Sequence, residues 1–282
     1  MAILDKRTHA WRDDLADTAL QGRVAAKNFV RPWPAQIRKP IVPLLRAPRG
    51  DSMQVSQALY GEKVMVFEER EGWAWVQLVE DSYVGYVPAD VLTRDVEAAS
   101  YRVAVPLTYA YPAPDLKSGP AVAMPLNARL RVIETVGSYS RLSGGFFVFS
   151  AHLRAEGTHE TDFVVVAEKF LHVPYLWGGK SVHGLDCSGL VQLALQAAGR
   201  TCPRDSDMQE RDVGVTLESN TISGLRRGDL VFWDGHVGIM TDAETLLHAN
   251  GHHMLTVAEP VSEAIARIAA SGKPVTSLKR VQ

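Results

Sequence analysis

Gly184-Leu-Asp-Cys-Ser-Gly-Leu190 decides how the C-terminal half of the chain folds. Asp186 is a residue type that caps helices, and it stands directly before Cys187. Apolar residues then recur at helical spacing along one face, and Gly199 follows the last of them. The positions of this face are Leu190, Val191, Ala194 and Ala198. The stretch therefore predicts a helix that begins at Cys187 and is closed by Gly199.

Strand-length apolar segments follow this helix in the sequence. They are Asp229–Trp233, His236–Met240 and Thr245–His248. The dipeptide Asp234-Gly235, between the first two, is a strong signal for a two-residue hairpin turn. Upstream, residues 163–171 predict a further helix, capped by Thr161 or Asp162. Helices followed by an antiparallel sheet predict an α+β domain over residues 156–282.

The N-terminal half of the chain has a different texture. From about residue 41 to 154, short β-branched segments are separated by Gly, Pro, Asn and Asp. The clearest segments are Lys63–Phe67, Trp73–Leu78 and Tyr83–Val87. A weaker copy follows, in which Val103–Pro106 resembles Ile41–Pro43, Asn127–Val132 resembles Gly61–Val66, and Phe146–Val148 resembles Gly85–Val87. The pattern predicts two small all-β barrels, residues 36–95 and 96–155, after an N-terminal extension, residues 1–35.

Bulk composition excludes several classes of protein. The 282 residues carry a net charge of −2, which argues against a nucleic-acid groove or an anionic membrane surface as partner. No apolar run approaches the roughly 18–20 residues that span a bilayer. Only two cysteines occur, so disulfides do not hold the fold together. We therefore expect a reduced, cytoplasmic protein.

The position of Cys187 gives it a chemical interpretation. Its sulfur is expected in the first turn of the predicted helix, where unpaired N–H groups and the helix dipole favour a thiolate. Together with a neighbouring imidazolium, such a site lowers the pKa of a cysteine to roughly 3.5–7.5. Cys187 is thus a candidate nucleophile, which needs a histidine to protonate the leaving group. The alternative is a buried cysteine that only fills space in the core.

Two histidines follow at positions that suit this chemistry. His236 starts one predicted strand and His248 ends the next, twelve positions later. Residues that lie opposite each other in an antiparallel pair point to the same face. We therefore expect His236 to be the general base and His248 to hold its ring in the working tautomer. Each histidine taken alone is more often structural, so the interpretation depends on the order of all three residues.

The remaining histidines and the second cysteine give weaker signals. His248, His252 and His253 suggest a metal site, but no carboxylate or pair of thiolates accompanies them at a ligand spacing. Cys202 stands beside Pro203 with no histidine near it in the sequence. We therefore expect no metal and no other cofactor, and we interpret Cys202 as a bystander.

Taken together, several short motifs resemble those of the NlpC/P60 family of papain-like cysteine peptidases, in the order of that family. They are Pro174-Tyr-Leu-Trp-Gly-Gly179, Gly184–Leu190, Pro203-Arg-Asp-Ser206, Gly228-Asp-Leu-Val-Phe232, Gly235-His-Val-Gly-Ile239 and His248-Ala249. The resemblance covers about residues 160–260 and implies a papain-like α+β fold. It implies a catalytic triad of Cys187, His236 and His248. It also implies that Tyr175 lies beside the sulfur, near the oxyanion, and that the substrate pocket is lined by Asp186, Ser188 and Ser206.

A domain of this type behind two SH3-like barrels resembles the murein-peptide hydrolases of cell-wall recycling. Those enzymes cut the bond between γ-D-glutamate and the following diamino acid, and they require a free N-terminal L-alanine. The resemblance implies that Glu62, in Leu59-Tyr-Gly-Glu62, supplies an acidic group for the ammonium, and that Tyr83 or Tyr86 is an aromatic wall of the pocket. The expected partner is a murein-derived peptide. Three alternatives stay open: an amidase or acyltransferase on the same cysteine fold, a cell-wall-binding module, and a zinc hydrolase.

Overall fold

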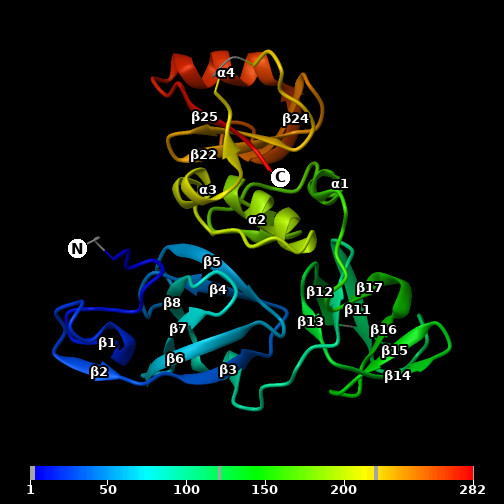
Figure 1. Ribbon diagram of the computed structural model, residues 1–282. Helices are drawn as coiled ribbons and strands as arrows, with labels where there is room; N and C mark the ends of the chain where they lie inside the picture. Colours follow the sequence, from blue (N-terminus) through cyan, green and yellow to red (C-terminus); the bar gives the residue numbers. More distant parts are fainter. Residues whose placement is uncertain (1–3, 120–121, 219–221, 282) are drawn as a thin grey trace. The chain divides into compact units, whose positions relative to one another are not determined.

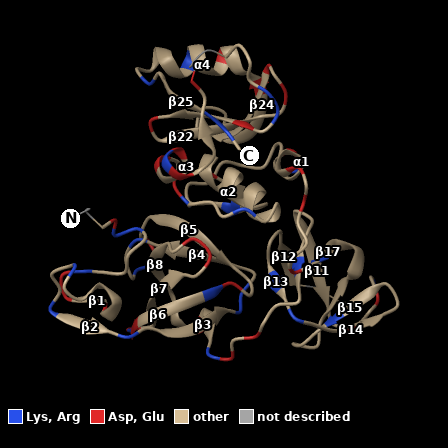
Figure 2. Cartoon of the chain, viewed as in Figure 1, with Lys and Arg blue, Asp and Glu red and all other residues tan. Residues whose placement is uncertain are grey.

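The computed structural model describes residues 4–119, 122–218 and 222–281, and the chain divides into two compact units, residues 1–156 and 157–282. Among the described residues, the first unit is built of strands and short turns of 3₁₀ helix, whereas the second combines strands with α-helices (Figure 1). Acidic and basic side chains are interspersed along both units (Figure 2). Within the described ranges, none of the helices has the length and apolar character that a membrane crossing needs.

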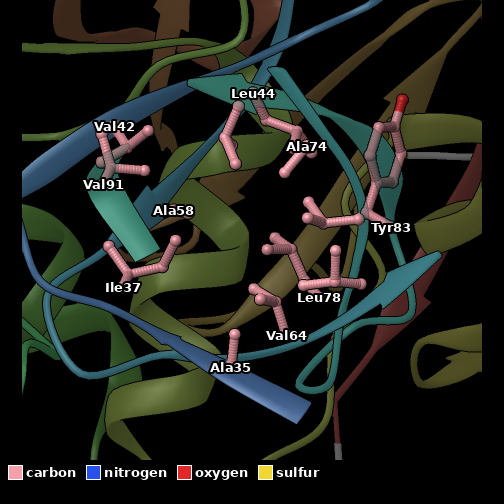
Figure 3. Close-up of a cluster of buried hydrophobic side chains, with 13 residues drawn as sticks. Ala35, Ile37, Val42, Leu44, Ala58, Val64, Ala74, Leu78, Tyr83 and Val91 are labelled. Atoms are coloured by element: carbon pink, nitrogen blue, oxygen red, sulfur yellow. The ribbon is translucent and has the colours of Figure 1, made fainter. Parts of the chain in front are cut away.

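Seven strands within residues 33–93 form one antiparallel sheet. In spatial order they are β5 (Gln54–Leu59), β4 (Ile41–Leu45), β8 (Val84–Pro88), β7 (Trp73–Leu78), β6 (Lys63–Arg70), β3 (Trp33–Ile37) and β9 (Leu92–Thr93). Successive side chains of a strand point to opposite faces. The inward-facing apolar residues of these strands, among them Ile37, Leu44 and Leu78, pack into one core (Figure 3).

Strand β3 crosses the boundary expected between the N-terminal extension, residues 1–35, and the first barrel, because Pro32-Trp33-Pro34 is typical of a break in the chain. In the structure, Pro34 lies opposite Met65 of β6. The strand on the other side, β9, pairs only with Gln36 and Ile37. Among the described residues, no second strand therefore pairs with β3 at Pro34, and proline is tolerated at such a position. Ahead of β3, the short strands β1 (Leu15–Asp17) and β2 (Asn28–Val30) pair in parallel.

Two further sheets occupy the described part of residues 101–155. One has the order β13 (Arg129–Leu130), β10 (Tyr101–Val103) and β17 (Leu153–Ala155). The other has the order β12 (Val122–Pro125), β11 (Leu107–Tyr111), β16 (Phe147–Phe149), β15 (Tyr139–Leu142) and β14 (Val132–Val136). The repeat seen in the sequence has a physical basis at one turn: Asn127 and its counterpart Gly61 both adopt left-handed backbone, with φ of 64° and 77°. Asparagine and glycine are the residue types that tolerate this conformation.

The described part of the second unit is built on a six-stranded antiparallel sheet. Its order is β20 (Val215–Thr216), β25 (Val275–Arg280), β21 (Asp229–Trp233), β22 (His236–Met240), β23 (Thr245–Asn250) and β24 (Leu255–Pro260). Helices α2 (Cys187–Ala197) and α4 (Val261–Ala270) lie on opposite faces of this sheet (Figure 1). The predicted hairpin is present, because Trp233 lies opposite His236 and Gly235 in the turn has a φ of 75°.

The first helix of this unit, α1 (Phe163–Glu168), is shorter than the sequence predicts. Asp162 is its cap and accepts a hydrogen bond from the Val164 N–H at 2.9 Å. The chain leaves the helix early because it turns through His172, which has a φ of 68° and donates its N–H to the Thr256 carbonyl. This turn lays the next residues beside β24. The other short elements are β18 (Lys180–Ser181), β19 (Gly184–Leu185) and α3 (Ser206–Asp212).

Candidate active site

Helix α2 begins at Cys187, as the sequence predicts. Oδ1 of Asp186 accepts the N–H of Gly189 at 2.7 Å, so Asp186 caps the helix through its side chain. Gly189 has no side chain for a steric reason, because a Cβ there would lie 2.2 Å from the carbonyl oxygen of Gly179. The Gly178-Gly179 loop therefore passes directly over the start of the helix.

Arg204 ties this helix start to the loop that follows α2. Its guanidinium lies 2.9 Å from Oδ1 and 2.7 Å from Oδ2 of Asp186, and 3.0 Å from Oγ of Ser188. The Arg204 side chain is 1% exposed. Gly178 adds its N–H to the same carboxylate at 2.8 Å. Asp186 is therefore held in a buried ion pair with Arg204, and Ser188 accepts a hydrogen bond from the same guanidinium. The predicted contact of both residues with a substrate stays a prediction.

The surroundings of Cys187 differ from the electrostatics that the sequence suggests. Its sulfur is buried and lies near the backbone N–H groups of Val237 and Ser188. Burial, followed by the negative charge of Asp186, raises the pKa of the thiol to about 12; the two N–H groups and Arg204 act the other way and are outweighed. The predicted lowered pKa is therefore wrong for this geometry, because removal of the sulfur from water exceeds what the helix start offers.

The structure brings His236 and His248 together. In the pairing of β22 with β23, Ile239 lies opposite Leu247, so the two histidines are diagonal neighbours on the same face of the sheet. Nε2 of His236 is 2.8 Å from Nδ1 of His248. Because that bond occupies Nε2, the Nδ1 atom of His236 is the one left for proton transfer.

The start of β22 lies beside the start of α2, since Val237 presents its N–H to the Cys187 sulfur. In the described part of the chain, the hydrogen bond of the His236 ring is the one to His248. Among the described residues, no hydrogen bond joins this ring to the Cys187 sulfur. Catalytic hydrogen bonds of unliganded sites are often long and tighten when substrate binds. Burial, followed by His248, lowers the pKa of His236 to about 3, so its ring is neutral near pH 7.

Residues 172–269 match the NlpC/P60 family, and residues 44–92 match the bacterial dipeptidyl-peptidase Sh3 domain. The chain carries an NlpC/P60 domain. The helix start at Cys187 and the histidines of β22 and β23 all lie within the matched residues.

Known proteins resemble the chain across both units. Dipeptidyl-peptidase 6 of Lysinibacillus sphaericus is 26% identical over 220 residues, which cover 70% of this chain and 80% of that protein. Gamma-D-glutamyl-L-lysine dipeptidyl-peptidase of Bacillus subtilis strain 168 is 27% identical over 243 residues, or 76% of this chain and 79% of that one. A solved NlpC/P60 family protein of Bacillus cereus ATCC 10987 has a TM-score of 0.74 at 21% identity, covering 88% of this chain and 99% of that chain.

These matches confirm the predicted fold class, in which small all-β SH3-like structure precedes a papain-like α+β domain. They also confirm the predicted class of enzyme, a cysteine peptidase. The matches do not assign roles to single residues, which are argued from the geometry of the site.

Two further predicted pocket residues lie in the NlpC/P60 domain. Tyr175 is half-buried, and burial, followed by the nearby Cys187 and Asp186, raises the pKa of its phenol. It therefore keeps its proton and is a hydrogen-bond donor beside the sulfur. Ser206 is the first residue of α3, two positions after Arg204, and is also half-buried. Their contact with a substrate stays a prediction.

Glu62 and Tyr83, the other two predicted pocket residues, lie in the first unit. Glu62 is 5% exposed, and its Oε2 accepts the N–H of Leu59 at 3.0 Å, so it is not an exposed turn residue. Tyr83 belongs to the core of the first sheet (Figure 3). Tyr86, the alternative aromatic residue, accepts a hydrogen bond from Arg12 through its hydroxyl. Because Cys187 lies in the other unit, a shared pocket stays a prediction.

The NlpC/P60 domain also contains polar partners that the sequence does not predict. Glu259, on β24, lies 2.6 Å from Nε2 of His248, and Arg267 of α4 holds the same carboxylate. The strand Leu255–Pro260 was not predicted. The argument used for His236 and His248, that neighbouring antiparallel strands place side chains on one face, would also have applied to it. Arg204 is part of the Pro203–Ser206 motif, but no role was predicted for it. Nothing local in the sequence marks it as the partner of Asp186.

Two of the three histidines considered for a metal have other hydrogen-bond partners. His248 is bonded to Glu259 and His236, whereas His253 is bonded to Asn250, through both its ring and its backbone N–H. In the ranges that the structure describes, no three His, Cys, Asp or Glu side chains are grouped for metal binding.

The state of the thiol is open to direct measurement. We expect the rate of alkylation of Cys187 by iodoacetamide to rise about tenfold per pH unit between about pH 6 and pH 9, because the reactive thiolate is a minor species below the raised pKa. The measurement uses Cys202→Ala protein, so that one thiol is followed, with mass spectrometry to locate the label. A rate that stays flat over this range means that the thiolate is already formed, and contradicts the raised pKa.

Proposed function

We propose that this cysteine peptidase hydrolyses the bond between γ-D-glutamate and the following diamino acid in short murein peptides with a free N-terminal L-alanine. The proposal includes a cytoplasmic role in the recycling of cell-wall peptides. Cys187 is the nucleophile, His236 the general base and acid, and His248 the residue that orients His236.

The observation that carries the proposal is the similarity to Gamma-D-glutamyl-L-lysine dipeptidyl-peptidase over 76% of this chain, which includes SH3-like as well as peptidase residues. The site supports it chemically. A sulfur at a helix start and a neutral imidazole at the adjacent strand are what acyl transfer by a cysteine needs.

The first half of the reaction forms a thioester. Nδ1 of His236 accepts the proton of the Cys187 thiol while the sulfur attacks the γ-glutamyl carbonyl carbon. The oxyanion of the tetrahedral intermediate is placed at the first turn of α2, where backbone N–H groups have no intrahelical partner, with the Tyr175 hydroxyl as a further donor. His236 then gives its proton to the leaving α-amine of the diamino acid, and the C–N bond breaks.

The second half releases the dipeptide. His236 removes a proton from a water molecule, which attacks the thioester carbonyl carbon. The C–S bond breaks, the sulfur takes the proton back from His236, and L-Ala-D-Glu leaves as a free acid. The resting pair is a neutral thiol and a neutral imidazole. Proton transfer from Cys187 to His236 therefore accompanies the attack of the sulfur on the bound substrate.

Product analysis tests this function directly. Purified protein is incubated with L-Ala-γ-D-Glu-diamino acid tripeptides, containing either lysine or diaminopimelate, and the products are identified by mass spectrometry. We expect L-Ala-D-Glu and the free diamino acid from at least one of the two peptides. Release of neither product from either peptide overturns the proposal and favours an amidase, an acyltransferase or a binding module.

Glu62 is proposed to hold the α-ammonium of the substrate. Removing one partner of a buried charged pair costs about 3–5 kcal/mol. Glu62→Gln is therefore expected to lower kcat/KM for the free tripeptide by roughly two to four decades. Glutamine is the suitable change because it keeps the size of the side chain and an oxygen acceptor for the Leu59 N–H.

The matched control is on the substrate. N-acetylation of the peptide removes the ammonium. It is expected to lower kcat/KM of the unmodified protein as much as Glu62→Gln does, and to lower that of the variant little further. If the acetylated peptide is cut as fast as the free one, or if the two losses are simply additive, Glu62 does not hold the ammonium.

A further inference from the structure

Glu259 and Arg267 extend the two histidines into a chain of four polar side chains. On β24, Glu259 lies opposite Leu246, whereas Val257 lies opposite His248. Glu259 and His248 are therefore diagonal neighbours on one face of the sheet. Oε1 of Glu259 lies 2.6 Å from Nε2 of His248, and the His248 side chain is fully buried.

Arg267 holds the same carboxylate from α4. Its terminal nitrogens lie 2.5 Å from Oε1 and 2.6 Å from Oε2 of Glu259. Burial opposes ionisation of Glu259, but the hydrogen bonds from Arg267 and His248 outweigh it and lower the pKa to about 2. Glu259 is therefore a carboxylate, which accepts hydrogen bonds and donates none.

The carboxylate decides where the histidine protons lie. Because Glu259 only accepts, Nε2 of His248 carries the proton of that ring, and Nδ1 of His248 is an acceptor. Nε2 of His236, 2.8 Å from this Nδ1, must therefore donate. Nδ1 of His236 is left with a lone pair, which is the form that a general base needs.

We propose that Glu259 is a positioning residue that fixes the tautomers of His248 and His236, so that His236 keeps an unprotonated Nδ1 for the Cys187 thiol. Its effect on turnover rests on the proposed function, whereas its effect on the tautomers does not. When His236 takes the proton, the new imidazolium is two hydrogen bonds from the carboxylate, which stabilises it through His248.

Among the charged groups that act on His236, the Glu259 carboxylate is the one that raises its pKa. Burial lowers the pKa of His236 most, and His248, Arg267 and Lys273 lower it further, while Glu259 raises it. Burial is also the main cause that lowers the pKa of His248. Arg267 and His253 lower it further, whereas Glu259 raises it. Loss of the Glu259 charge therefore leaves cations facing both rings without this opposing charge.

Glu259→Gln tests the proposal, because an amide donates as well as accepts and so permits the opposite tautomers. We expect kcat to fall roughly 10- to 100-fold with KM nearly unchanged, since Glu259 acts through His248 and not on the substrate. Glu259→Asp keeps the charge and is expected to recover part of the loss. Glu263→Gln is the matched control: the same change at an exposed position of α4, near Arg267, is expected to leave activity unchanged.

Nitrogen-15 NMR of the imidazole rings gives a readout that needs no substrate. In the unmodified protein we expect both His236 and His248 to be protonated at Nε2 and bare at Nδ1, and Glu259→Gln to disturb this pattern. If the Gln protein does not fold, Arg267→Gln takes its place: it leaves the carboxylate on His248 and is expected to keep the pattern.

Each outcome decides a separate point. Unchanged tautomers with unchanged kcat in Glu259→Gln protein, or altered tautomers in Arg267→Gln protein, overturn the positioning role. An unmodified protein that shows the expected tautomers and cuts no murein peptide overturns the proposed function instead, and leaves the role of Glu259 standing.

Discussion

Replacing Cys187 by alanine is expected to abolish peptide hydrolysis, with kcat falling by about 10⁶-fold. The magnitude is that seen when the nucleophile of a covalent hydrolase is removed, because the other members of the triad then have no group to activate. Cys187 is small and lies at the start of α2, so alanine fits the same space and preserves the helix. The measurement is product formation from the tripeptide by mass spectrometry, at enzyme concentrations high enough to detect single turnovers.

Cys202→Ala is the matched control for this change. Cys202 is also buried, and its thiol donates a hydrogen bond to the backbone carbonyl of Pro203 at 3.5 Å. The same loss of one sulfur atom at this position is expected to leave kcat and KM close to those of the unmodified protein. If the two variants have equal activity, Cys187 is not the nucleophile.

Replacing His236 by alanine is expected to lower kcat by roughly 10³- to 10⁴-fold. His236 is the group proposed to take the thiol proton and to return it to the leaving amine, so its loss stops both halves of the reaction. The thiol has a raised pKa and does not supply a thiolate by itself near pH 7. Residual activity of His236→Ala protein is therefore expected to rise as the pH increases, because hydroxide replaces the missing base.

Two histidine variants give the comparison for this result. His248→Ala is expected to lose less, roughly 10- to 100-fold, because His248 orients the base and does not carry the transferred proton. His252→Ala changes an exposed histidine that lies outside the proposed machinery and is expected to be fully active. A loss in His252→Ala protein as large as that in His248→Ala protein would favour the metal site considered for His248, His252 and His253 over the triad.

The elements nearest Cys187 were predictable because local chemistry determines them. A capping aspartate, an apolar helical face and a closing glycine mark α2, and an Asp-Gly pair marks the β21–β22 hairpin. The end of α1 was not predictable, since the turn at His172 is fixed by a hydrogen bond to Thr256 on a strand far along the chain. Strand β3 was missed for a related reason. Its proline reads as a break until the short partner β9 is known.

The candidate site shows the same division between local and long-range causes. The contact between His236 and His248 follows from strand periodicity and a short connection, both of which are visible in the sequence. The raised pKa of Cys187 is not visible there, because it depends on how deeply the sulfur is buried. Arg204 and Arg267 reach their carboxylates through tertiary packing, which no spacing rule in the sequence encodes.

The buried pair between Arg204 and Asp186 has a consequence for local unfolding. Asp186 holds the amide protons of Gly178 and Gly189, and Arg204 holds Asp186 from a loop eighteen residues further along. Fraying of the helix start alone would leave a buried charge without its partner, at a cost of about 3–5 kcal/mol. We therefore expect the Gly-Gly loop, the first turn of α2 and the loop around Arg204 to open as one cooperative segment. Their amide protons are then expected to exchange with solvent together.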